Sequence, residues 1–552
     1  MSIIIPFFRG TKPRLSPKHL DISNSQIARN CNLKRGILAP VLNLEGQAPN
    51  PIPKAGTIRS IYKLDSGEWL YWTNDVDVVK SAASSSDRIM FTGDSYPKQT
   101  DQALATSGDI STYPTQTKRL GLPKPDQPLT VQLAPASVAD DAELERSTSY
   151  VYTYVTEWGE ESEPSDPTGN IDVKTGQGCL LSNFRLPTLD GVAVTHFRLY
   201  RLNSGDTGAE YQLIPWSDAA ADMPASETDY LDELKDSELS SEILQTENWS
   251  RPEDDVKGLI HTGNGIFFCF KGKDIFVSES FIPYAYPWNF KLSVPSEIVG
   301  LGYFDQTVVV LTKDKAHLIA GIDPSSLSMD KLAFNQSCVA KKSIVNIPGG
   351  VLYAAPDGLT LIGPEGVNML TRPLYTKEQW QALEPEKLIS FYHDGQYFGF
   401  FEGTNRGIIY DFELQDIVNI ELAGKKVYGG YVDTEDDALY LLTFDDTNYR
   451  IEKWEGSATP MSYLWKSKDS FYSIAINMGA ARIIGTQSAL SPLAFRLYED
   501  GKLFFTNSIT SEEAFRLPSG TLARDWEFEI EGTAEVYEVR VSTSIGDLQR
   551  GN

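Results

Sequence analysis

Short apolar runs recur between residues 256 and 454, and this recurrence constrains the fold more than any other feature of the chain. Each run is four to six residues long and rich in β-branched and aromatic side chains, which is too short for an ordinary globular helix. Pairs such as Asn264-Gly265 and Asp394-Gly395 bound the runs, as in β-hairpins. The strongest runs centre near Ile266, Val309, Leu352, Phe398 and Leu439, at intervals of 43, 43, 46 and 41 residues. Intervals of this length predict the four-stranded blades of a β-propeller.

Length and composition predict a multidomain all-β chain. A chain of 552 residues exceeds the roughly 250–300 residues that one core usually holds, and 41% hydrophobic residues suffice for several cores. The expected order is an extended basic N-terminal arm (1–55), first propeller strands (56–125), an inserted fibronectin-III-like β-sandwich (126–235), an acidic connector (236–255), propeller blades (256–460) and a C-terminal β-sandwich or barrel (461–552).

The N-terminal segment is predicted to hold one short helix within an otherwise extended chain. Ser23 or Asn24 is placed to cap a helix over residues 20–31 that packs Ile27 inward, while the prolines at 13, 17, 40, 51 and 53 prevent longer regular elements. Residues 56–75 alternate around an Asp-Ser-Gly turn, which predicts a hairpin that contributes to a sixth blade.

Two further groups of alternating strands indicate sandwich domains. Tyr150, Tyr152 and Tyr154 alternate with smaller residues, and a turn at 157–162 and strands at 196–202 and 211–214 follow at fibronectin-III-like spacing. Near the C-terminus, antiparallel strands are predicted at residues 471–476, 494–498, 526–530 and 534–541.

Charge is distributed unevenly along a chain whose net charge is −26. Residues 1–60 carry nine Lys and Arg against only Asp21 and Glu45. This contrast predicts a basic arm that docks on an acidic partner and a body to which nucleic acid does not adhere. Solubility alone is the alternative explanation of the acidic excess.

Signatures of catalysis, metal binding and membrane insertion are missing from the sequence. There is no phosphate-binding loop, HExxH or GxSxG motif, and no apolar window approaches a membrane span or a signal-peptide core. The four cysteines are far apart and without metal-ligand spacing, which predicts buried free thiols and assembly in a reducing cytoplasm. We therefore expect no enzyme activity, cofactor or metal.

Several stretches, in this order along most of the chain, resemble the tail nozzle, or tail tubular protein B-like, proteins of short-tailed bacteriophages. They include Ala28-Arg29-Asn30-Cys31, the segment YTYVT at 152–156 with GEESEPS at 159–165, Gly321-Ile322-Asp323-Pro324, Trp465-Lys466-Ser467-Lys468 and FRLPSG at 515–520.

The resemblance implies a virion protein of the tail, assembled in the host cytoplasm and without catalytic residues. Its copies would form a hexameric ring below the portal and the head-to-tail adaptor, with fibres, spikes or a tip plug attached and viral DNA passing through without specific binding. The basic arm suggests adaptor-docking residues Arg9, Lys12, Arg14 and Lys18. Acidic groups suggest a channel lining of Asp433, Glu435, Asp436, Asp437, Asp445 and Asp446, although without a ligand-spacing pattern solvated turns are the simpler explanation.

Two alternatives from other classes remain open. A carbohydrate-active propeller would bind or hydrolyse a glycan of the host surface and would need paired carboxylates in one pocket. A receptor-binding module would show affinity for a glycan or a protein without turnover.

Overall fold

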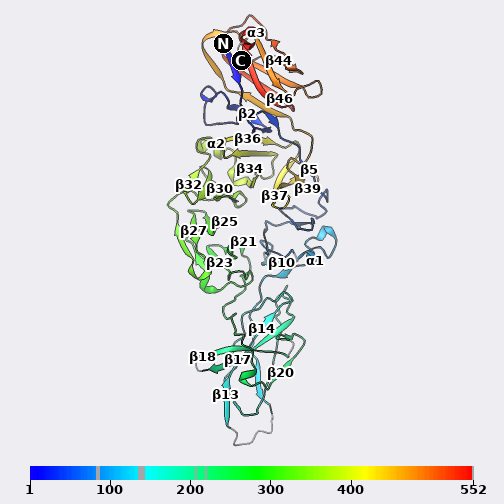
Figure 1. The fold of residues 1–552 in the computed structure, drawn as a ribbon, viewed down its shortest axis with the longest axis vertical. Coiled ribbons are helices and arrows are strands. Elements are labelled where there is room, and N and C mark those ends of the chain that lie inside the picture. Colours follow the sequence, from blue (N-terminus) through cyan, green and yellow to red (C-terminus); the bar gives the residue numbers. More distant parts are fainter. Residues whose placement is uncertain (82–86, 135–142, 206–207, 218–219, 550–552) are drawn as a thin grey trace.

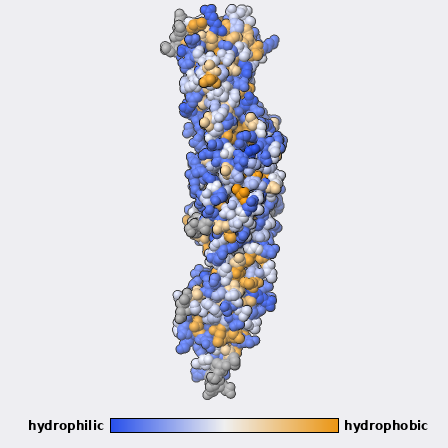
Figure 2. Space-filling model, turned by 90° about the vertical axis from the view of Figure 1, so that its right-hand side faces the viewer, coloured by the Kyte–Doolittle hydropathy of each residue, from blue (hydrophilic) through white to orange (hydrophobic). Residues whose placement is uncertain are grey.

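The computed structural model describes residues 1–81, 87–134, 143–205, 208–217 and 220–549 of an elongated, almost entirely β-stranded protein (Figure 1). A propeller occupies the middle, an inserted domain lies at one end, and a sandwich that holds both chain termini lies at the other. The prediction of a multidomain all-β chain is confirmed. On the face shown in Figure 2 the surface is mainly hydrophilic, and hydrophobic residues gather in small separate patches.

The propeller consists of sheets arranged as a ring, whose first strands contact one another in sequence. Within the described residues it contains five separate four-stranded sheets, a sixth four-stranded blade that continues into a larger sheet, and one two-stranded hairpin. In ring order the strands are β8 (Asp77–Lys80), β9 (Ile89–Thr92), β10 (Lys98–Thr100) and β11 (Lys118–Arg119); β21 (Lys257–His261), β22 (Phe267–Lys271), β23 (Asp274–Val277) and β24 (Leu292–Ser293); β25 (Ile298–Phe304), β26 (Thr307–Thr312), β27 (His317–Ala320) and β28 (Ser328–Lys331); β29 (Val345–Ile347), β30 (Gly350–Ala355), β31 (Gly358–Gly363) and β32 (Gly366–Met369); β33 (Leu388–His393), β34 (Gln396–Phe401), β35 (Arg406–Asp411) and β36 (Asp416–Glu421); β37 (Lys426–Asp433), β38 (Ala438–Phe444), β39 (Tyr449–Lys453) and β5 (Glu45–Gly46); and the hairpin β6 (Ser60–Lys63) and β7 (Trp69–Trp72).

The repeat recognised in the sequence marks one particular strand of each blade. Val309, Leu352, Phe398 and Leu439 lie in β26, β30, β34 and β38, and Ile266 directly precedes β22. These second strands are the most buried of their sheets, because they pack on both faces against neighbouring blades. The predicted hairpin at residues 56–75 is present as β6 and β7.

The inserted domain packs three small sheets around a tyrosine-rich core. The sheets are β12 (Thr130–Leu133), β16 (Cys179–Ser182) and β20 (Asp229–Asp232); β13 (Leu144–Thr148) and β15 (Ile171–Lys174); and β14 (Tyr150–Val155), β17 (His196–Gly205), β18 (Gly208–Ile214) and β19 (Met223–Pro224). Tyr150, Tyr152 and Tyr154 share the core face, as predicted. Val151 on the opposite face is also buried, because Leu244 of the acidic connector covers it together with Tyr211.

The terminal sandwich combines the first and last segments of the chain. One sheet contains β1 (Ser2–Ile5), β47 (Val536–Ser542), β42 (Ala480–Gly485) and β45 (Phe515–Arg516). The facing sheet contains β40 (Tyr463–Ser467), β46 (Ala523–Gly532), β43 (Leu493–Glu499), β44 (Lys502–Ile509) and β41 (Ser470–Ile476). Trp465, Trp526 and Phe528 are fully buried between the sheets, and the strands expected near the C-terminus are confirmed. Short helices complete the fold: α1 (Gln102–Ala105), α2 (Lys377–Gln381) and α3 (Ile545–Gln549).

The helix predicted over residues 20–31 is wrong. This segment forms β2 (Ser25–Arg29), followed by β3 (Cys31–Asn32), which pairs with β4 (Ala39–Pro40). β2 runs parallel to β36 and antiparallel to β40, so propeller and terminal sandwich share one ten-stranded sheet. Ile27 is 37% exposed, whereas Ala28 is fully buried. Pairing with strands distant in sequence overrides the local helical preference, which is a weak term.

Candidate functional site

The basic residues proposed for docking lie along an extended N-terminal segment that packs on the chain itself. Thr11 N donates to Ile417 O at 2.8 Å, which fixes the segment on the blade edge. The Arg9 guanidinium lies 5.5 Å from the ring centre of Phe7, and Arg14 Nη1 donates to Arg372 O at 2.6 Å. The expected arm is therefore extended, but it is not free of the body.

Lys18 is engaged most firmly of the four. Its ammonium lies 3.0 Å from the Asp525 carboxylate and 3.8 Å from that of Asp469, in the terminal sandwich. The hydrogen bond to Asp525 raises the pKa of Lys18. Lys12 has no ion-pair partner among the described residues. The four cations therefore spread along the body and do not form a single patch.

The acids predicted to line a channel separate into two groups. The first lies at the turn between β37 and β38, where Asp433 Oδ2 is 2.9 Å from Lys63 Nζ and Asp436 contacts the same ammonium. Burial opposes the charge on Lys63, yet the hydrogen bonds that its ammonium donates to Asp436 and Asp433 raise its pKa. Glu435 is 3.8 Å from Lys80, and Asp437 is 91% exposed.

The second acidic group lies at the opposite end of β38. Asp445 accepts hydrogen bonds from the backbone N–H groups of Thr447 and Asn448 and pairs with Arg450 at 2.7 Å. The backbone bond from Asn448 and the Arg450 side chain lower the pKa of Asp445 to about 2. Asp446 contacts Lys426. Seven residues of β38 span about 20 Å, so the two groups lie at opposite faces of the propeller.

A cleft of about 530 Å³ lies where the first strands of the blades begin, and an ion pair crosses it. Lys341, which precedes β29, places its ammonium 2.8 Å from Asp77 at the start of β8 and 3.1 Å from Asp75. Two blades separate β29 from β8 in the ring, so the pair bridges the axial opening. The carboxylates of Asp77 and Asp75 raise the pKa of Lys341 despite its burial. Gly300 makes room for this segment, because a Cβ there would lie 2.4 Å from Ile344 Cδ1.

A second unpredicted cluster fastens the insert to the propeller. Trp158, in the turn after β14, has two cations against its ring: the Arg88 guanidinium lies 5.0 Å and the Lys118 ammonium 4.5 Å from the ring centre. Glu160 in the same turn is 2% exposed, with its carboxylate 2.8 Å from Gln99 Nε2 and 3.4 Å from Arg88 Nη1. Burial raises the pKa of Glu160. The sequence showed a turn here, and its only signal was the tryptophan beside acidic residues.

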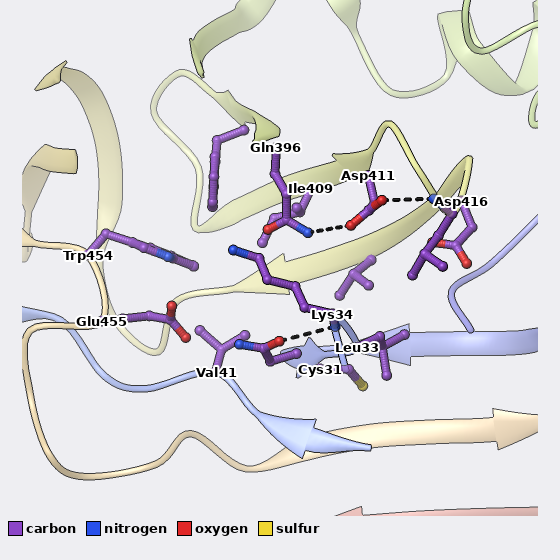
Figure 3. A pocket seen from close by; sticks show the side chains of 14 residues that line it. Cys31, Leu33, Lys34, Val41, Gln396, Ile409, Asp411, Asp416, Trp454 and Glu455 are labelled. Atoms are coloured by element: carbon purple, nitrogen blue, oxygen red, sulfur yellow. Dashed lines mark hydrogen bonds between the residues drawn. The ribbon is translucent and has the colours of Figure 1, made fainter. Parts of the chain in front are cut away.

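A small cavity lies at the joint between the N-terminal segment and the blade of β33–β36 (Figure 3). Its volume of about 30 Å³ holds roughly one or two water molecules. Lys34 and Trp454 extend over it, and Gln396 Nε2 donates to Asp411 Oδ2 at 2.9 Å, the bond drawn in Figure 3. The cavity is too small for a substrate or a cofactor and belongs to the packing of the joint.

In the described ranges, no group of three or more His, Cys, Asp or Glu is placed to hold a metal ion. The four cysteines are buried and free, as expected, and burial raises the pKa of Cys338 to about 12. No helix in the described part of the chain is long and apolar enough to cross a membrane.

Comparisons with known proteins give remote likenesses. No family model matches the sequence, and no curated protein matches it. Among solved structures, the RRP9 WD40 repeats share 8% identity at a TM-score of 0.30, covering 75% of this chain and 99% of that chain. The AfRom2 CNH domain shares 11% identity at a TM-score of 0.28, covering 75% and 97%. An exo-beta-1,3-galactanase from Phanerochaete chrysosporium shares 8% at 0.21, covering 51% and 95%.

TM-scores of 0.30 or less do not establish a shared fold. The fold is therefore assigned from the sheets themselves. Antiparallel four-stranded sheets follow one another round a ring, and β5 from the N-terminal region completes the blade of β37–β39. The chain is a multidomain all-β protein in which a β-propeller connects an inserted sandwich to a terminal sandwich.

Proposed function

We propose that this chain is a structural subunit of a short-tailed bacteriophage tail, a nozzle protein whose copies form a ring below the head-to-tail adaptor and conduct the genome during ejection. The observation that carries the proposal is the ten-stranded sheet that runs from the propeller into the terminal sandwich through β2. Domains joined by a linker move relative to one another unless their interface is large. A continuous hydrogen-bonded sheet removes that hinge, as the wall of a conduit requires.

The opposite joint supports the same proposal. Trp158 and Glu160 hold the insert on the propeller through Arg88, Lys118 and Gln99. The molecule is therefore braced at both of its internal boundaries. In the proposed tail, the terminal sandwich and the N-terminal segment face the adaptor, and fibres, spikes or a tip plug attach to the remaining surface.

Charge supports a conduit that DNA passes without binding. The net charge of −26 repels phosphates, and a nucleic-acid-binding surface would need clustered cations instead. Asp437 is the acid best placed for this role, because its side chain is 91% exposed while Asp433 and Asp436 are occupied by Lys63. The proposal requires no catalytic residue, cofactor or metal.

Docking on the adaptor is assigned to the N-terminal cations. Lys18→Glu would break contacts with Asp525 and Asp469 of the same chain, so its effect on assembly would be ambiguous. Lys12→Glu is the cleaner test, because Lys12 has no ion-pair partner among the described residues. We expect this variant to fold and to leave tails incomplete, and normal particles would exclude Lys12 from docking.

The experiment that tests the proposed function is immunogold electron microscopy of phage-like particles from the source, with antibody raised against this chain. Gold at the distal end of a short tail is the expected result. Particles without label would overturn the proposal, and a screen of the purified chain against host-surface glycans would then test the carbohydrate-binding and receptor-binding alternatives.

A further inference from the structure

An open groove of about 480 Å³ is lined by residues of β32, the last strand of the blade formed by β29–β32, and of α2. Figure 1 shows both elements on the same side of the propeller. Residues 367–369 of β32 line the groove, together with Arg372 and Tyr375 of the following loop and Lys377 at the start of α2. Arg14 of the N-terminal segment closes one wall, where its backbone N–H donates to Leu374 O at 2.7 Å. The volume is in the range of ligand sites in proteins.

The groove is positively charged on a strongly acidic protein. Arg14, Arg372 and Lys377 contribute three cations, and Asp357 is the only carboxylate among the described residues that line it. Asp357 is already occupied, by Lys377 at 2.8 Å and by Gln336 Nε2 at 2.7 Å. The Arg372 guanidinium has no ion-pair or hydrogen-bond partner in the described part of the chain, so it is available to a ligand.

One side of the groove is an unpaired strand edge. β32 is the outermost strand of its sheet and pairs only with β31 among the described residues. The hairpin closes at the pair Gly363 and Gly366, and hydrogen-bonded pairs alternate from there. The backbone N–H and C=O of Val367 therefore point away from β31, towards any strand that is added at this edge.

We propose that the groove binds an extended acidic segment of a partner protein, which adds as a strand to β32 and places carboxylates against Arg14 and Arg372. Main-chain hydrogen bonds supply affinity in strand addition, and side-chain pockets supply specificity. Arginine favours carboxylates because its planar guanidinium can donate two parallel hydrogen bonds.

A peptide fits this site better than a nucleic acid does. A nucleic-acid backbone carries no N–H donors for the open carbonyl of Val367. The net charge of −26 further opposes a polyanion that extends beyond the groove. The inference does not require that the chain belongs to a virion, so its failure would leave the proposed function untouched.

The test uses the purified full-length chain and a fluorescent peptide of about ten residues in which glutamate alternates with threonine, a length that matches an extended strand. Fluorescence anisotropy should show saturable binding to the wild type, and Arg372→Glu should weaken it by about tenfold or more. Arg14→Gln, at the other wall, should weaken binding by a smaller factor. Arg516→Glu is the matched control, because Arg516 is exposed and lies in β45 of the terminal sandwich.

Two further probes separate strand addition from charge attraction alone. The same peptide with alternate backbone nitrogens methylated should lose its binding, and a single-stranded oligonucleotide should not displace the original peptide. The inference is overturned if the wild type does not bind the peptide, if Arg372→Glu binds as tightly as Arg516→Glu, if methylation has no effect, or if the oligonucleotide competes.

Discussion

The backbone N–H of Asn30 donates to the backbone carbonyl of Asn419 at 2.9 Å. This bond joins the N-terminal segment to the outer strand of a propeller blade. The Asn30 side chain adds a second link, because its amide oxygen accepts the N–H of Glu421 at 2.8 Å. The propeller and the terminal sandwich are therefore joined by backbone hydrogen bonds, which side-chain substitutions at the surface leave in place.

The first prediction concerns the buried face of β2. The Ala28 side chain is fully buried in the core where β2 connects the propeller to the terminal sandwich. Ala28→Asp therefore introduces an unpaired carboxylate into this core. We expect a loss of about 3 kcal/mol in the free energy of unfolding. Chemical denaturation monitored by tryptophan fluorescence measures this loss. Ile27→Asp, on the exposed face of the same strand, is the control and should remain close to wild type.

The second prediction concerns the ion pair across the propeller axis. Lys341→Met leaves the carboxylates of Asp75 and Asp77 without their cation, at an expected loss of about 2–3 kcal/mol because the site is partly screened by solvent. Adding Asp77→Asn should restore part of the stability. Lys313→Met, an exposed change in the adjacent blade, should have no effect. Equal midpoints for Lys341→Met and Lys313→Met in urea would show that the pair does not hold the blades.

The third prediction is a pH dependence at the joint between insert and propeller. Burial raises the pKa of Glu160 in the folded state above the unfolded value of about 4.3. The native state therefore holds this proton more tightly than the unfolded chain, and its stability falls as pH rises through the window between the two values.

Glu160→Gln removes this titration and keeps a hydrogen-bond acceptor for Gln99. The melting temperature of the variant relative to wild type should therefore increase from pH 4 towards neutral pH. A difference between variant and wild type that does not change over this pH range would mean that Glu160 is ionised at no cost.

The fourth prediction follows from the proposed conduit. Asp437→Lys reverses an exposed charge, and we expect slower DNA exit with a delay that shrinks as salt is added. Asp437 has a left-handed backbone with φ of 46°, which costs a lysine about 1 kcal/mol. Asp305→Lys is matched in chemistry and, with φ of 49°, in backbone strain, but it lies in another blade. If both variants eject DNA at the wild-type rate, Asp437 does not face the DNA.

The sequence revealed the propeller because its second strands are buried on both faces. Leu352 and Phe398 lie in such strands, so their apolar runs were visible without any knowledge of their partners. β2 was misjudged for the opposite reason. Its partners β36 and β40 lie near the other end of the chain, and nothing within residues 20–31 records them.

The candidate site residues were harder to place than the strands. The acids from Asp433 to Asp446 are close in sequence, yet β38 carries them to opposite faces. Lys341 and Asp77 are remote in sequence, and only closure of the ring brings them together. Charge can be counted along a chain, but the distance between charges depends on the topology.

Two strands of the N-terminal segment, β2 and β5, complete sheets whose other strands are encoded near the end of the chain, and this constrains folding during synthesis. β2 and β5 leave the ribosome early, whereas their partners β36, β39 and β40 emerge only after hundreds of further residues. Until then two strand edges stay open and two sheets stay incomplete, the state in which nascent chains are most prone to aggregation. A chain that is released before β39 has been made cannot complete the blade of β37–β39 and β5. Cellular proteases should degrade such fragments quickly.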